Sequence, residues 1–192
     1  EKWAYVDVRE GVHMFYWLYQ SYHEAGYLTR PLILWLQGGP GGSGCGYGNF
    51  DIIGPITIDQ EERNHTWVKQ ANVLFIDNPV GAGYSYVDDF QYLTTTNQEI
   101  TDDLLVVLRA FLDDNPEFEE NSVPFYVFGQ SYGGKMGNYF TNRLYQENEA
   151  GNFALNLKGY AMGNAWISPV DSVLTWGGTL FWMSTLDEPG LA

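Results

Sequence analysis

The sequence predicts an α/β fold, with a mostly parallel sheet and helices on both of its faces. Short apolar runs of strand length recur along the chain, at 32–36, 73–76, 125–128 and 157–162. Segments with helical spacing separate the later runs, and two of the runs end in glycine-rich turns. Strands that alternate with helices are typical of parallel sheets.

The strands are of two kinds. Residues 3–8 and 12–19 are rich in aromatic and β-branched residues and are separated by Arg9-Glu10-Gly11, which predicts a hairpin. Residues 32–36 and 73–76 are compact apolar runs, as expected of strands buried on both faces.

Two helices are predicted between the later strands. The first is expected to start at Thr96, which has capping-box spacing to Glu99, and to end before Asn115-Pro116. The second is expected to run from Ser131 to about Asn148. The carboxylates at 102–103 and 113–114 are expected on solvated helix surfaces and not in a metal site, because no histidine accompanies them.

The composition narrows the classes of partner. The 192 residues include 24 acidic and 9 basic ones, which gives a formal net charge of −15 and a pI near 4.3. Such a charge repels nucleic acid and anionic membrane surfaces, so we expect neither as a main partner. The apolar runs are too short to span a bilayer. Cys45, the only cysteine, is expected either to be reduced or to pair with a residue outside this sequence. The composition does not indicate an oligomeric state.

The segment Gly129-Gln130-Ser131-Tyr132-Gly133 matches the pattern G-x-S-x-G. An apolar strand enters it and a helical segment leaves it, which is the context of a nucleophile elbow. The turn exposes the serine Oγ, and glycines flank it because side chains there would collide with the neighbouring strand and helix. The sequence therefore predicts the N-terminal portion of an α/β-hydrolase fold, with Ser131 as nucleophile. The alternative is that Ser131 only caps a helix.

A second motif follows the strand at 32–36. The run Gln37-Gly38-Gly39-Pro40-Gly41-Gly42 lets backbone N–H groups point outward without side chains in the way. In elbow hydrolases one oxyanion donor comes from this loop and the other from the residue after the nucleophile, which assigns Gly39 and Tyr132. A phosphate-binding loop is disfavoured, because its lysine is absent and no clean helix is expected to follow. A purely structural turn is the third interpretation.

The motifs taken together resemble the serine carboxypeptidases (peptidase family S10), and within them the retinoid-inducible group. The resemblance is carried by four segments in order, at 35–42, 78–86, 129–136 and 163–171, and it covers nearly all of the chain. It implies a secreted or lysosomal enzyme that hydrolyses C-terminal peptide bonds through an acyl-enzyme, without metal or cofactor. Its partner would be a peptide with a free C-terminal carboxylate.

The resemblance also implies how the carboxylate is held. Gln37 and Gly38 match the positions of an amide side chain and a backbone N–H that grip it, and Asn164 matches a residue near the site. The family places a glutamate before the nucleophile, where this chain has Gln130, and another where it has Ile52 beside Asp51. An amide donates at any pH, so we expect terminal-carboxylate binding to depend less on acid.

The catalytic base is not found in its expected place. Elbow hydrolases order their triad as Ser, then Asp or Glu, then His, yet all three histidines precede Ser131. We expect the N-terminal part of a longer enzyme, inactive alone, with core residues at 1–165 and a truncated cap beginning at 166–192. The alternatives are an acyltransferase of the same fold and a non-catalytic scaffold.

Two further features are left open by the sequence. Trp166, Trp176 and Trp182 are expected either to line a substrate pocket or to pack in the core or cap. The sequon at Asn64 permits N-glycosylation in a secreted protein.

Overall fold

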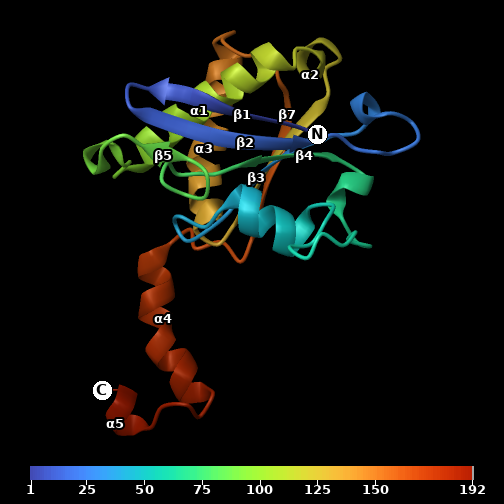
Figure 1. Cartoon of the computed structure of the whole chain (residues 1–192). Helices are drawn as coiled ribbons and strands as arrows, with labels where there is room; N and C mark the ends of the chain where they lie inside the picture. Colours follow the sequence, from blue (N-terminus) through green and yellow to red (C-terminus); the bar gives the residue numbers. More distant parts are fainter. Residues whose placement is uncertain (192) are drawn as a thin grey trace.

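A seven-stranded sheet runs through the protein in the order β1-β2-β4-β3-β6-β7, with β5 paired to β2. The computed structural model describes residues 1–191, and Figure 1 shows how they are arranged. The strands are β1 (Lys2–Arg9), β2 (Val12–Tyr19), β3 (Leu32–Leu36), β4 (Asn72–Ile76), β5 (Tyr86–Val87), β6 (Pro124–Gln130) and β7 (Asn156–Gly163). β4, β3, β6 and β7 are parallel, and β1 and β2 form the predicted antiparallel hairpin. The mostly parallel sheet is thus confirmed.

Helices cover both faces of this sheet (Figure 1). The α-helices are α1 (Asn97–Asp114), α2 (Glu117–Glu120), α3 (Tyr132–Glu149), α4 (Pro169–Trp182) and α5 (Glu188–Leu191). The remaining helices are the 3₁₀ turns η1 (Tyr27–Thr29), η3 (Trp67–Lys69) and η4 (Phe90–Tyr92) and the wide helix η2 (Gly44–Ile53). α1 and α3 pack on one face of the sheet with β2, β3 and β4, and η2 and η3 pack on the other.

The burial of the strands follows their place in the sheet. Every residue of β3 and β4 is buried, as their apolar runs predict. β6 alternates between buried and half-buried residues, so the apolar run at 125–128 is buried less completely than β3 and β4. β7 is half-buried or exposed throughout, because β6 is its only neighbour in the sheet. The face of the sheet on which η2 and η3 pack is therefore left partly uncovered at the end formed by β6 and β7.

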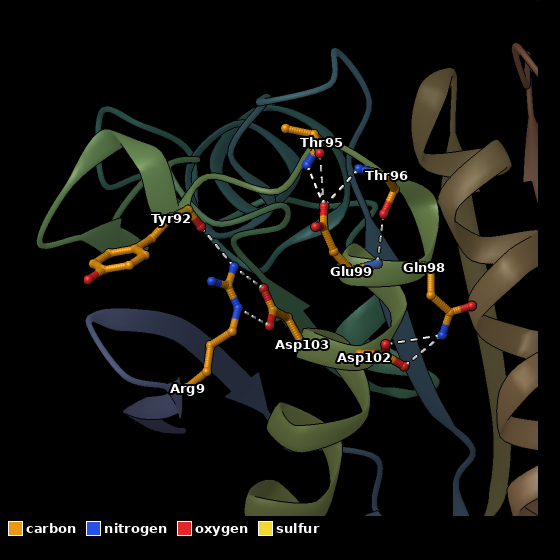
Figure 2. A network of polar contacts seen from close by, with 8 residues as sticks. All are labelled: Arg9, Tyr92, Thr95, Thr96, Gln98, Glu99, Asp102 and Asp103. Carbon is orange, nitrogen blue, oxygen red and sulfur yellow. Dashed lines mark hydrogen bonds and ion pairs between the residues drawn. The ribbon is translucent and has the colours of Figure 1, made fainter.

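α1 begins with the predicted capping box. The Thr96 hydroxyl accepts a hydrogen bond from the Glu99 N–H, and the Glu99 carboxylate accepts one in return from the Thr96 N–H (Figure 2). These reciprocal bonds occupy two backbone donors that a helix start otherwise leaves free. Hydrogen bonds from the backbone of Thr95 and Thr96 lower the pKa of Glu99, so the cap persists in mild acid.

Asp103 corrects the expectation of a solvated carboxylate on α1. Its side chain is 5% exposed and accepts two hydrogen bonds from Arg9 of β1, at 2.9 Å from Nε and 3.1 Å from Nη2. The same Nη2 donates to the Tyr92 carbonyl at 2.8 Å, so one guanidinium joins β1, α1 and η4 (Figure 2). Asp102, one residue earlier, faces solvent as predicted. Adjacent carboxylates on a helix point about 100° apart, and a run of two acids does not reveal which of them is buried.

α4 extends away from the sheet (Figure 1). None of its residues is buried, and Leu174 and Trp182 are among its exposed apolar side chains. Among residues 1–191, no helix combines the length and apolar character needed to cross a membrane.

The Arg9–Asp103 pair provides a test of this architecture. We expect Arg9→Ala to lower the free energy of unfolding by about 3 kcal/mol, because it leaves a buried carboxylate without its partner. Urea denaturation measures the change. Asp102→Ala on the same helix is the matched control and should change stability by less than about 0.5 kcal/mol. Equal effects of the two substitutions would contradict the burial of Asp103.

Candidate active site

The carboxyl ends of the four parallel strands meet at one edge of the sheet. Gln37 follows β3, Asp77 follows β4, Ser131 follows β6 and Asn164 follows β7. The register pairs Leu36 with Gly129 and Gln130 with Gly163, so the loops that follow these strands start side by side. Ligand sites of open α/β sheets lie at this edge.

Ser131 forms the turn between β6 and α3. Its φ and ψ are 55° and −122°, a backbone conformation that a non-glycine residue rarely adopts. Two backbone hydrogen bonds hold the turn in place. The Ser131 N–H donates to the Gly163 carbonyl at 3.0 Å, and the Ser131 carbonyl accepts from the Trp166 N–H at 2.9 Å. The side chain is half-buried and makes no capping hydrogen bond to α3. This is the strand–turn–helix geometry of a nucleophile elbow. Ser131 directly precedes α3 without capping it through its side chain, and its role as nucleophile remains a prediction.

The flanking glycines are required by close packing. A Cβ at Gly133 would lie 2.2 Å from the Leu36 carbonyl oxygen of the neighbouring strand. A Cβ at Gly129 would lie 2.3 Å from the Gly133 carbonyl oxygen of the helix. Both distances are far below van der Waals contact, so the predicted collisions with strand and helix are confirmed.

Gly38 brings the loop after β3 directly against the serine. A Cβ at this position would lie 2.7 Å from Ser131 Cβ and 3.2 Å from Ser131 Oγ. Gly39, the next residue, has φ of 122°, in a region that favours glycine. The Gly42 N–H donates to the Gly38 carbonyl at 2.9 Å and closes the turn around Gly39.

The two expected oxyanion donors lie on either side of this contact. Tyr132 is the first residue of α3, and the first N–H groups of a helix have no partner within it. Gly39 belongs to the turn that touches Ser131. Both assignments as donors remain predictions, since they depend on where a substrate carbonyl is bound.

A chain of hydrogen bonds orients two amide side chains beside the serine. The Trp35 indole N–H donates to Gln37 Oε1 at 2.9 Å, and Gln37 Nε2 donates to Gln130 Oε1 at 2.7 Å. Because an indole only donates, Gln37 Oε1 must be the acceptor, and Gln130 must accept with its own oxygen. The Gln130 NH₂ group is therefore left to donate beyond this chain. Gln37 is 6% exposed and keeps one further N–H.

The other predicted site residues are placed differently. Asn164 follows β7 with φ of 46° and is exposed, in the segment whose Trp166 N–H binds the Ser131 carbonyl. Asp51 is exposed on η2 and makes no hydrogen bond to Gln37, Gln130 or Ser131 within the described residues. Trp166 packs near Tyr132, with ring centroids 6.5 Å apart.

Trp176 and Trp182 lie on α4, where they are 54% and 84% exposed. Of the alternatives for these two residues, packing in the core is not found within residues 1–191, and a place in a substrate pocket or a cap remains a prediction.

No histidine of the described residues approaches the serine. His13 lies on β2, three strands from β6 in the sheet, or roughly 14 Å at the usual strand spacing. Its Nδ1 is 2.6 Å from Asp7 Oδ1, and this hydrogen bond is the main reason that the pKa of His13 is raised. His23 and His65 lie at the opposite edge of the sheet, after β2 and before β4.

Two features of the site were missed by the sequence reasoning. The helix η2 directly follows the glycine-rich run, although no clean helix was expected there. Its ten residues contain three glycines, but Ser43 caps it by accepting from the Gly46 N–H at 2.7 Å. Asp77, which directly follows β4, was not identified as a site residue, but it is fully buried at the site edge. An acid directly after a buried parallel strand is the signal that could have identified it.

Within residues 1–191, no group of three or more histidine, cysteine, aspartate or glutamate side chains is arranged to hold an ion.

The fold and the elbow define the class of protein as an α/β-hydrolase. The crystal structure of Kex1(delta)p, a prohormone-processing carboxypeptidase from Saccharomyces cerevisiae, superposes on this chain with a TM-score of 0.82. The match covers 97% of this chain and 43% of that one, at 23% identity. A putative hydrolase from Agrobacterium vitis matches with a TM-score of 0.55 over 84% of this chain, at 15% identity. At such identities the likeness concerns the fold alone.

The chain belongs to the serine carboxypeptidase family, because the model of that family matches residues 1–192. The retinoid-inducible serine carboxypeptidase of Mus musculus is 47% identical over 193 residues, and serine carboxypeptidase-like 51 of Arabidopsis thaliana is 40% identical over 195 residues. Each alignment covers all of this chain but 42% of the relative. The chain thus spans less than half the length of these relatives.

The contact between Gly38 and Ser131 leads to a prediction. In the full-length protein we expect Gly38→Ala to slow modification of Ser131 by a fluorophosphonate about 100-fold or more, because the new methyl group displaces the loop from the serine. Mass spectrometry of the labelled serine measures the rate. Gly163→Ala is the control, since a Cβ there meets no atom within 4 Å. Undiminished labelling of Gly38→Ala would contradict the close approach.

Proposed function

We propose that this protein is a serine-type carboxypeptidase, which releases C-terminal residues from peptides through an acyl-enzyme at Ser131. One observation carries the proposal: an elbow serine lies directly beside Gly38 and the paired amides of Gln37 and Gln130. A reactive hydroxyl and a set of hydrogen-bond donors for a carboxylate thus lie side by side. Family membership supports the same activity.

The proposed reaction proceeds in two steps. Ser131 Oγ attacks the carbonyl carbon of the last peptide bond and loses its proton to a base. The oxygen that becomes negative accepts hydrogen bonds from the N–H groups of Gly39 and Tyr132, at the N-terminal end of α3. The C–N bond then breaks, the leaving amine takes the proton, and water hydrolyses the ester. No metal or cofactor takes part in this scheme.

The proposed grip on the terminal carboxylate follows from the orientation of the amides. Gln130 accepts from Gln37 through its oxygen, so its NH₂ group is available to an anion. The remaining N–H of Gln37 and the backbone N–H of Gly38 are further donors. Asp51 is a weaker candidate, because it is exposed and forms no contact with the amides in the described structure. Asn164 lies across the elbow and is proposed to border the substrate.

The proposal requires a base that the three histidines do not supply. Without a base a serine hydroxyl is a weak nucleophile, and loss of a triad histidine lowers kcat by about 10⁶-fold. We propose that an acid and a histidine outside these 192 residues complete the triad, and that these residues alone are inactive. In the same proposal residues 1–165 belong to the hydrolase core and 166–192 begin a cap. A secreted or lysosomal location is part of the proposal.

Two peptides test the function in the full-length protein. A blocked dipeptide with a free C-terminus should release its last residue, and the same peptide ending in an amide should react at least about 100-fold more slowly, because it offers no carboxylate. Ser131→Ala should abolish release. Chromatography of the released amino acid measures both.

Other outcomes of this experiment separate the alternatives. Transfer of the acyl group to an added alcohol or amine, in preference to water, would indicate an acyltransferase. Binding of the peptide without turnover by the full-length protein would indicate a non-catalytic scaffold and overturn the proposal.

The amide at position 130 leads to a prediction about pH. A glutamate there binds a carboxylate only when protonated, so Gln130→Glu should lose kcat/KM as pH rises above roughly 4.3, the usual pKa of glutamate. The wild-type enzyme should lack this alkaline loss, because an amide donates at any pH. A pH profile of kcat/KM for the blocked dipeptide, measured for the wild-type protein and for Gln130→Glu, tests this prediction. Identical profiles would remove Gln130 from the carboxylate site.

A further inference from the structure

We infer that Asp77 is a positioning residue: its buried carboxylate anchors the glycine-rich loop (residues 38–48) and thereby fixes the Gly39 N–H relative to Ser131. The inference rests on the proposed function, to which it adds the group that aligns an oxyanion donor. Asp77 touches neither the serine nor the amides and acts through the loop alone.

Asp77 is fully buried at the carboxyl end of β4. Its Oδ1 accepts hydrogen bonds from Ser43 Oγ at 2.6 Å and from the Cys45 N–H at 3.0 Å. Its Oδ2 accepts from the Tyr84 N–H at 2.8 Å. None of the ion pairs of residues 1–191 includes Asp77, so hydrogen bonds alone compensate the burial of its charge.

These bonds connect two loops at the site edge. Ser43 lies in the glycine-rich loop, Cys45 lies in the first turn of η2 at the end of that segment, and Tyr84 belongs to the β4–β5 loop (residues 77–85). The β4–β5 loop is itself held to the sheet, because Ser85 Oγ donates to the Asp77 carbonyl at 2.7 Å and accepts from the Phe15 N–H at 2.8 Å. One carboxylate therefore fastens the glycine-rich loop to a rigid support.

The anchor acts on the turn that touches the serine. Ser43 directly follows Gly42, whose N–H closes the turn onto the Gly38 carbonyl. Gly44, on the other side of Ser43, packs so closely on β4 that a Cβ would lie 2.5 Å from the Ile76 carbonyl oxygen. The turn around Gly39 is thus held at Gly38 by contact with Ser131 and at Ser43 by Asp77.

An uncharged amide cannot make the same bonds. All three partners of Asp77 donate hydrogen bonds to its oxygens in this structure. Asparagine would have to turn its NH₂ group toward either the Tyr84 N–H or the pair formed by Ser43 and Cys45, and two donors would then face each other. Burial and the neighbouring carboxylate also raise the pKa of the Cys45 thiol, which keeps it neutral beside Asp77.

Three variants of the full-length protein test the inference. Asp77→Asn should lower kcat for the blocked dipeptide about 100-fold, because a displacement of about 1 Å in a catalytic group costs that much. Ser43→Ala, which removes one bond to the anchor, should lower kcat about tenfold. KM should change less than about twofold in both, since the amides of Gln37 and Gln130 are untouched and Gly38 is held by its contact with Ser131. Hydrogen exchange of residues 38–48 should accelerate in both.

Ser21→Ala is the matched control for Ser43→Ala. Ser21 is buried whereas Ser43 is half-buried, but the Ser21 hydroxyl likewise donates to one acceptor, the Val68 carbonyl at 2.9 Å. Ser21 lies at the opposite edge of the sheet. The Ser21→Ala variant should have the same kcat as the wild-type protein and the same hydrogen-exchange rates in residues 38–48, whatever its effect on the melting temperature.

The outcomes separate this inference from the proposed function. If the wild-type protein is active and both Ser43→Ala and Asp77→Asn have unchanged kcat, the inference about Asp77 is overturned and the proposed function is not. A loss of kcat that the Ser21→Ala variant shares would likewise overturn the inference alone. Absence of activity in the wild-type protein would overturn the proposed function, and the exchange of residues 38–48 would then still decide whether Asp77 anchors the loop. If Asp77→Asn does not fold, Ser43→Ala decides.

Discussion

The pairing of β3 with β6 is the constraint on which the candidate site depends. It sets Leu36 opposite Gly129, so the glycine-rich loop and the nucleophile elbow leave the sheet as neighbours. Only glycine at 38 and 133 lets the two segments approach, because a methyl group at either position would overlap the other segment. Strand register therefore places Ser131 and the groups around it, and a slip of one residue would turn every side chain of β6 to the other face.

The site also has a defined hydrogen-bond direction. A single donor-only group, the Trp35 indole, decides how Gln37 is oriented, and Gln37 in turn decides how Gln130 is oriented. The indole is held in the cluster on the η2 face, where it packs edge-on against Trp67 with centroids 5.6 Å apart. Packing of the Trp35 indole on one face of the sheet thus determines that Gln130 presents its NH₂ group at the edge of the sheet.

Local patterns were enough to predict most of the elements. The capping box at Thr96, the all-apolar β3 and the strand–turn–helix around Ser131 depend on neighbours in the sequence, and all three are found. The features that were missed depend on residues far apart. Asp103 is buried because Arg9 reaches it from 94 positions away, and Asp77 is buried because Ser43 and Tyr84 converge on it. The helix η2 was missed because its glycines disfavour helix, whereas its cap and its packing on β4 support it.

The hydrogen bonds that fix Ser131 also have a consequence for the order of synthesis. The elbow backbone is held by the Gly163 carbonyl and the Trp166 N–H, both contributed by residues made after the serine. A serine with φ of 55° is strained, so the turn persists only when such partners restrain it. The Ser131 turn of a growing chain therefore cannot reach its final geometry until the segment after β7 has emerged from the ribosome and docked. A nascent chain that stops at α3 would lack both of these restraints on the Ser131 backbone.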